Sequence, residues 1–71
     1  MEQGEFTNEI TAIDSKGKVY TINEFKVPGK HLYFLNDGTR VYRMSDNLFQ
    51  IADTEIDLRT VLTRKSTSET N

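Results

Sequence analysis

The feature that most constrains the fold is an Asp-Gly pair, Asp37-Gly38, between two apolar runs. This pair is a strong hairpin signal, because Gly adopts positive φ freely and Asp tolerates it. We expect a two-residue turn joining strands at 32–35 and 41–44. The first run, Leu32-Tyr33-Phe34-Leu35, is apolar on both faces, which is typical of a strand covered on two sides or closed into a barrel.

Further turn signals divide the rest of the chain into short strands. Residues 14–18, which read Asp-Ser-Lys-Gly-Lys, predict a three-residue hairpin with a bulge, Pro28-Gly29 predicts a loop, and 45–47 a tight turn. No window repeats apolar residues at helical spacing. The sequence therefore predicts an all-β fold, an SH3-like partly open barrel of five or six short antiparallel strands with frayed termini. The alternative is a three- or four-stranded meander that completes its core by dimerising.

Length and composition indicate one small domain. The chain has 71 residues and no cysteine, so its core is small and has no disulfide to support it. A homodimer would relieve that limit and stays an open alternative. We expect a flexible N-terminus at residues 1–5, a single β domain at 6–62 and a disordered polar tail at 63–71.

Targeting signals are missing from the sequence. The first five residues are acidic, no apolar run approaches the roughly 18 residues of a membrane span, and no lipidation motif is present. We therefore expect a cytoplasmic protein with no membrane partner.

The charges are segregated along the chain, although the formal net charge is only −2. Residues 26–45 carry Lys26, Lys30, Arg40 and Arg43 against a single acid, whereas the stretches on either side are acidic. Such blocks either make a bipolar surface or neutralise each other across neighbouring strands. The sequence leaves both interpretations open.

The sequence gives little support for a catalytic or a metal-binding site. His31 is the only histidine, and without a cysteine, a second histidine or a Gly-x-Ser-x-Gly elbow it lacks the partners that nucleophilic catalysis needs. Asp53, Glu55 and Asp57 alternate as on one strand face, but they lack the glycine and spacing of a calcium loop. We interpret them as a charged edge that discourages aggregation. The sequence predicts no enzyme, no catalytic residue, no metal and no cofactor.

Aromatic and basic residues around the central hairpin are the binding candidates. They are Tyr33, Tyr42, Arg40, Arg43, Lys30 and His31. Tyr and Arg commonly anchor interfaces, so we expect a non-catalytic interaction module for a protein or peptide. The alternative is a small barrel that binds single-stranded nucleic acid through residues 26–43. The negative net charge disfavours that alternative.

The chain also resembles a group of short uncharacterised bacterial proteins over residues 19–60. The shared pattern comprises Tyr20-Thr21-Ile22-x-Glu24-Phe25, Pro28-Gly29, Tyr33, Asp37-Gly38, Val41, Arg43, Asp46, Phe49, Ile51, Thr54, Leu58 and Arg59. The chain departs from it at Tyr42, where the pattern has Asn, and at Glu55, where it has Gly and where a different turn is therefore expected. The resemblance implies a bacterial source and a stand-alone module, and it implies no activity.

Overall fold

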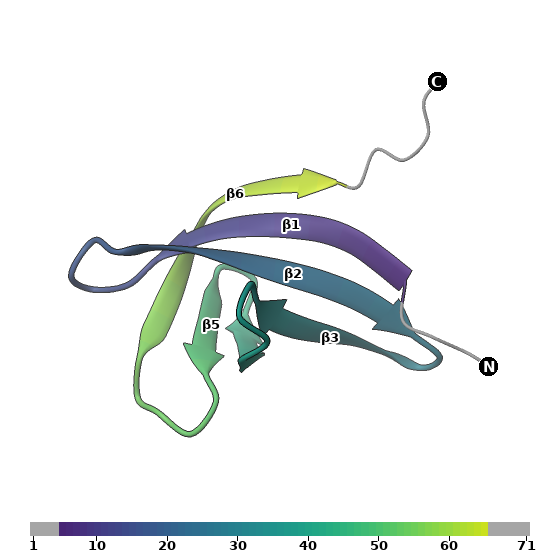
Figure 1. Ribbon diagram of the computed structural model, residues 1–71. Helices are drawn as coiled ribbons and strands as arrows, with labels where there is room; N and C mark the ends of the chain where they lie inside the picture. Colours follow the sequence, from purple (N-terminus) through teal and green to yellow (C-terminus); the bar gives the residue numbers. More distant parts are fainter. Residues whose placement is uncertain (1–4, 66–71) are drawn as a thin grey trace.

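The computed structural model describes residues 5–65, which form six antiparallel strands and no helix (Figure 1). The strands are β1 (Glu5–Ile13), β2 (Val19–Val27), β3 (Lys30–Leu35), β4 (Arg40–Ser45), β5 (Leu48–Ile51) and β6 (Asp57–Lys65). Each strand pairs with the next, and β6 returns to β1. The predicted small all-β barrel is confirmed. Its strands form a closed ring rather than a partly open one, so one chain completes its core without the second copy that a meander would need.

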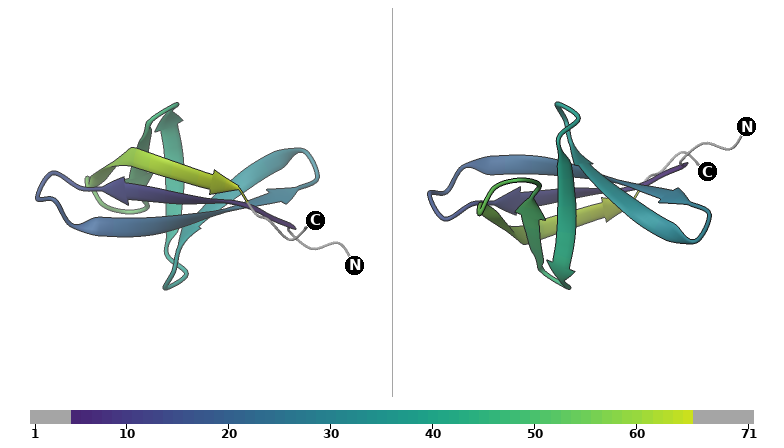
Figure 2. Two further views of the ribbon diagram at one scale, coloured as in Figure 1. Left: turned by 90° about the horizontal axis from the view of Figure 1, so that it is seen from above. Right: turned by 90° about the horizontal axis from the view of Figure 1, so that it is seen from below.

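The long strands bend strongly to close so small a barrel. In Figure 2 the strand β4 crosses the direction of β1 and β2, and the β2–β3 hairpin extends beyond the body of the barrel. The register shifts once in each of three strand pairs, at Thr7 in β1, at Val61 in β6 and at Met44 in β4. Each extra residue is a bulge that bends its strand and increases the local twist. These bulges allow nine-residue strands to wrap around a narrow core.

Two connections are three-residue loops with the same hydrogen bonds. In the first, Gly17 N donates to Asp14 O, and Gly17 has a φ of 85°, as the sequence predicts. In the second, Gly38 N donates to Leu35 O, and Gly38 has a φ of 93°. The expected two-residue Asp-Gly turn is wrong, because Gly38 alone takes the left-handed conformation and Asp37 lies one position earlier in the loop. The Asp37 carboxylate instead accepts a bond from Thr39 N at 2.9 Å.

The core lies inside the barrel and is built from alternate positions of all six strands. It consists of Ile10, Ala12, Ile22, Tyr33, Val41, Phe49, Ile51 and Leu58, with Tyr20 and Leu35 packed against it. Phe49 and Ile51 share the inner face of β5, as their spacing predicts. The rings of Tyr33 and Phe49 meet edge to face, with their centroids 5.0 Å apart. These residues make one contiguous core for the domain.

The boundaries of the domain differ slightly from the predicted ones. Strand β6 runs to Lys65, so the ordered chain extends past the expected end at residue 62. The rest of the predicted tail, 66–71, and residues 1–4 of the predicted flexible N-terminus lie outside the described residues. Within the described part of the chain, no helix has the length and apolar character of a membrane span.

The β1–β2 turn makes the stability of the domain depend on pH. The Asp14 carboxylate accepts bonds from the backbone N–H groups of Lys18 and Lys16, and a third from the Tyr20 hydroxyl. These bonds, led by the one from Lys18, lower the pKa of Asp14 in the folded chain. A lowered folded-state pKa adds stability above the unfolded value of about 3.9, and that stability is lost as the pH falls.

We therefore expect Asp14→Asn to be less stable than the wild type at neutral pH and to differ less from it near about pH 3. Urea unfolding of both proteins at the two pH values measures this difference. A gap of equal size at both values would contradict the assigned role of the Asp14 carboxylate.

Candidate binding surface

The six binding candidates separate into two places. Tyr33 and Arg43 line one open end of the barrel, and His31 lies beside them. Arg40 and Tyr42 lie on the outer face instead. Lys30 is exposed at the start of β3, after the Pro28-Gly29 turn. Tyr33, which the sequence suggests as a binding residue, is buried, since only 9% of its surface is accessible. Its side chain alternates to the same face as the buried Val41, with which it pairs across β3 and β4.

At the open end, polar side chains replace apolar ones along the inner face of the barrel. They surround a cavity of about 220 Å³ lined by Asn8, Ile10, Glu24, Tyr33, Arg43, Asp46, Phe49, Thr60 and Thr63. The apolar half of the core lies beyond this polar layer. We refer to this end of the barrel as the polar mouth.

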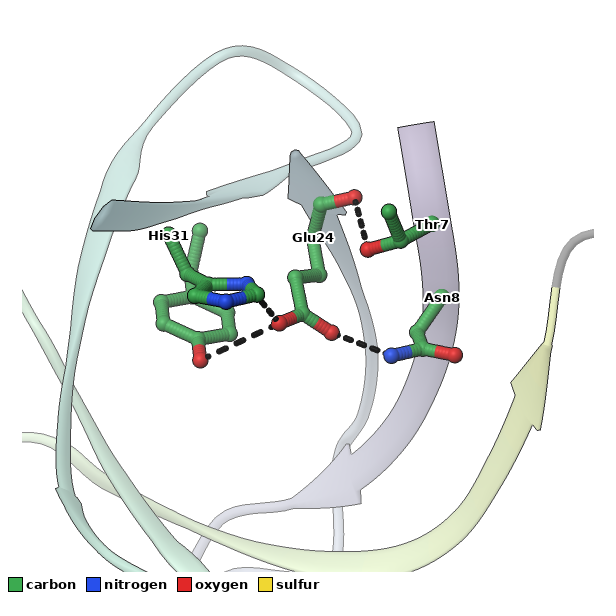
Figure 3. A network of polar contacts seen from close by, with 5 residues as sticks. Thr7, Asn8, Glu24 and His31 are labelled. Carbon is green, nitrogen blue, oxygen red and sulfur yellow. Dashed lines mark hydrogen bonds and ion pairs between the residues drawn. The ribbon is translucent and has the colours of Figure 1, made fainter. Parts of the chain in front are cut away.

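Glu24 is the centre of the polar mouth and is only 7% exposed (Figure 3). Its carboxylate accepts bonds from Asn8 Nδ2 of β1 and from the Tyr33 hydroxyl of β3 at 3.4 Å. His31 Nδ1, also from β3, lies 2.7 Å from Glu24 Oε2. A buried carboxylate is costly unless several donors satisfy it. Because these donors come from strands on both sides of β2, the network ties β1, β2 and β3 together.

The polar mouth also raises the pKa of the Tyr33 phenol. Burial is the main cause, and the negative charge of Glu24 adds to it, whereas Arg43 acts in the opposite direction. The Arg43 guanidinium donates to Asp46 Oδ1 at 3.1 Å and to the backbone oxygen of Ser45. The polar groups of the mouth thus find most of their partners within the chain itself, which indicates a structural role.

The outer face of the barrel carries a row of aromatic rings across three strands. Phe6 of β1 pairs with Phe25 of β2, and their ring centroids are 5.8 Å apart. Phe25 meets Phe34 of β3 at 6.0 Å, again edge to face. The residues that precede Phe25 and Phe34 in the sequence, Glu24 and Tyr33, point inward and are buried. The rings therefore lie on the side of the sheet that faces away from the core.

An apolar groove of about 510 Å³ follows these rings along the β2–β3 hairpin. It is lined by Asn23, Phe25, Val27, Leu32, Phe34, Leu35, Asn36 and Gly38. At one end the Asn23 amide donates to Asn36 Oδ1 at 2.9 Å. Of the two interpretations that the sequence allows for residues 32–35, closure into a barrel is the one observed, and Leu32 and Phe34 remain partly exposed in this groove. We call this surface the hairpin groove.

Arg40 extends the hairpin groove to β4. Arg40 is the cross-strand partner of Phe34, and its guanidinium carbon lies 5.6 Å from the centroid of the Phe34 ring. The same carbon lies 5.2 Å from the ring centroid of Tyr42, which is 49% exposed. Such distances allow cation–π attraction to both rings. The outer face therefore combines an apolar groove with a positive charge at its edge.

The segregated charges are only partly neutralised by neighbouring strands. In the described part of the chain, Arg43 forms an ion pair with Asp46, and the His31 ring contacts the Glu24 carboxylate through Nδ1. Within residues 5–65, Arg40 has no acidic side chain within ion-pair distance. Arg43 at the polar mouth thus has an acidic partner, whereas Arg40 on the outer face has none among residues 5–65.

The acidic run before β6 does not lie on one strand face. Asp53 has a φ of 64° and lies in the β5–β6 connection with Glu55, whereas Asp57 begins β6. The interpretation of these acids as one strand edge is therefore wrong. In the described chain, no three His, Asp or Glu side chains are grouped closely enough to hold a metal ion.

The strand alternation in the sequence carries a signal for both the polar mouth and the hairpin groove. The alternation that puts Tyr20 and Ile22 on the inner face of β2 also puts Glu24 there. The same alternation puts Phe25 outward beside Phe34. Comparison of the chain with protein-family models, with curated proteins and with solved structures found no match.

Proposed function

We propose that the chain is a non-catalytic interaction module that binds a peptide segment of another protein in the hairpin groove. The observation that carries this proposal is the partly exposed apolar groove beside the row formed by Phe6, Phe25 and Phe34. A small monomeric domain rarely leaves a contiguous apolar surface without a use. We further propose that it acts in the cytoplasm.

The closed barrel favours a groove over strand addition as the binding mode. Every strand in the described range pairs with a neighbour on both sides, so the barrel has no edge strand that is free along its whole length. Only short segments are unpaired, as at residues 30–32, because β3 pairs with β4 at Tyr33 and Phe34 alone. Aromatic-lined grooves bind peptides through side chains instead. The hairpin groove offers two phenylalanine rings together with Val27 and Leu32, which suits an apolar anchor residue.

Single-stranded nucleic acid remains the alternative occupant. Exposed rings can stack on bases, and Arg40 and Lys30 can meet phosphate. The aliphatic lining of the groove and the negative net charge favour the peptide. An oligonucleotide is therefore included as the competing probe.

Selection from a library of random twelve-residue peptides displayed on phage tests the proposal. We expect the wild type to enrich peptides that share an apolar anchor, and Phe34→Thr to bind the best of them about tenfold or more weakly, as at an interface hot spot. The matched control is Val61→Thr, which removes an exposed apolar side chain of β6. We expect this control to bind normally.

Three results would overturn the proposal. They are a selection that enriches nothing, equal binding by Phe34→Thr and the wild type, or binding of oligothymidine at low salt in place of the peptides. Thermal unfolding of each variant shows that the barrel is intact.

A further inference from the structure

We infer that the segment bound in the hairpin groove carries a carboxylate, from Asp or Glu beside its apolar anchor, and that Arg40 recognises it. This inference rests on the proposed function and specifies the partner of the same site. It comes from the surroundings of Arg40, which differ from those of the other arginine on the same strand, Arg43.

Arg40 is held in place by aromatic rings rather than by an acid. Phe34 across the strand pair and Tyr42 two positions along β4 both lie within cation–π distance of its guanidinium. The backbone on either side is fixed as well, because Arg40 O accepts a bond from Ala52 N at 2.9 Å. An arginine fixed in this way loses little side-chain freedom when a ligand binds.

The guanidinium of Arg40 lacks an acceptor within the described residues. Its Nε atom is buried and makes no hydrogen bond, and no carboxylate lies within ion-pair distance. Leaving a buried donor unsatisfied destabilises a protein. Arg43 differs in this respect, because its guanidinium already bonds Asp46 and the backbone of Ser45. Arg40 is thus a positioned cation with no acidic partner among residues 5–65.

A carboxylate is the ligand that this geometry fits. The planar guanidinium presents paired N–H groups that match the two oxygens of a carboxylate. Phe34 lines the groove and also contacts Arg40, so an apolar anchor in the groove brings its neighbouring side chain close to the guanidinium. A phosphate would present similar oxygens, but the aliphatic residues of the groove, Val27 and Leu32, favour a protein segment over a nucleic acid.

Parallel selections with the same phage library test this inference. The proteins are the wild type, Arg40→Gln and the control Arg43→Gln, which removes the same charge from the same strand. We expect the wild type and Arg43→Gln to enrich Asp or Glu next to the apolar anchor. We expect Arg40→Gln to enrich the anchor alone.

The best peptide and its amide analogue, in which Gln or Asn replaces the acid, provide the quantitative readout. We expect Arg40→Gln to weaken binding of the acidic peptide about tenfold or more and to leave the amide analogue almost unaffected. Urea unfolding of Arg40→Gln shows whether the barrel remains folded, and Arg40→Lys, which keeps the charge without the paired donors, should recover only part of the affinity.

The possible failures are distinguishable. Enriched peptides with an apolar anchor and no acid preference would overturn the inference about Arg40 and leave the proposed function intact. Enrichment of acids by Arg40→Gln as strong as by the wild type would also overturn it. A selection that enriches no peptide would overturn the proposed function. Arg40-dependent binding of oligothymidine alone would show that Arg40 recognises phosphate rather than a carboxylate, and it would overturn both the proposed function and the inference about Arg40.

Discussion

Phe49→Ala is expected to lower the free energy of unfolding by about 3–5 kcal/mol. Phe49 is 2% exposed, belongs to the shortest strand, and packs edge to face on Tyr33. Its side chain fills the space where β4, β5 and β6 meet, and a closed barrel cannot easily collapse around the cavity that alanine would leave. For a domain of this size the loss is a large share of the total stability.

Urea unfolding followed by circular dichroism measures this effect. The matched control is Phe6→Ala, because Phe6 is the same residue type, is 40% exposed and packs mainly on Phe25. We expect the control to cost about 1 kcal/mol, the usual value of an exposed aromatic pair. Equal losses in the two variants would show that the interior of the barrel is not packed as described.

Glu24→Ala is expected to give the second-largest loss, about 2–3 kcal/mol, because it removes the shared acceptor of the polar mouth. The buried Tyr33 hydroxyl and the Asn8 amide would both lose their partner. Removal of the His31 ring that contacts Glu24, by His31→Ala, should cost less than about 1 kcal/mol, since the His31 side chain is 49% exposed and water competes for the contact.

A double-mutant cycle between Glu24→Ala and Asn8→Ala separates the network from simple loss of volume. We expect the two losses to be clearly non-additive, because the second substitution removes a group that the first has already left without a partner. Additive losses would mean that Glu24 does not tie β1 to β2. A Glu24→Leu variant should recover part of the stability, since apolar replacements of buried charges are often tolerated.

The fold could be predicted from the sequence because local turn chemistry and alternation agree along most of the chain. The Asp14–Gly17 loop, the strands and the shared face of Phe49 and Ile51 all follow from residue type and spacing. The Asp37-Gly38 loop was placed correctly but assigned the wrong length. Both loop lengths accommodate that dipeptide, and only the register of β3 with β4 decides between them.

The candidate site could be predicted only in part, because alternation does not say which face of a strand points inward. Tyr33 and Phe34 are adjacent aromatic residues, and either could have been the exposed one. Tyr33 is buried because it pairs with Val41 on the face that meets Phe49, a contact between strands that are distant in sequence. Arg40 and Arg43 look equivalent in the sequence. Their odd spacing puts them on opposite faces of β4, but the sequence alone does not say which of the two faces points outward.

An amide-shift titration of the isotope-labelled chain with the best selected peptide tests the central claim most directly. The account predicts that the changes concentrate on β2, β3 and β4 around the hairpin groove, at Phe25, Leu32, Phe34 and Arg40, and that the amides of Asn8, Asp46 and Thr60, which line the polar mouth from other segments, stay unchanged. Changes centred instead on Asn8, Asp46 and Thr60 would contradict the claim that the hairpin groove is the binding surface.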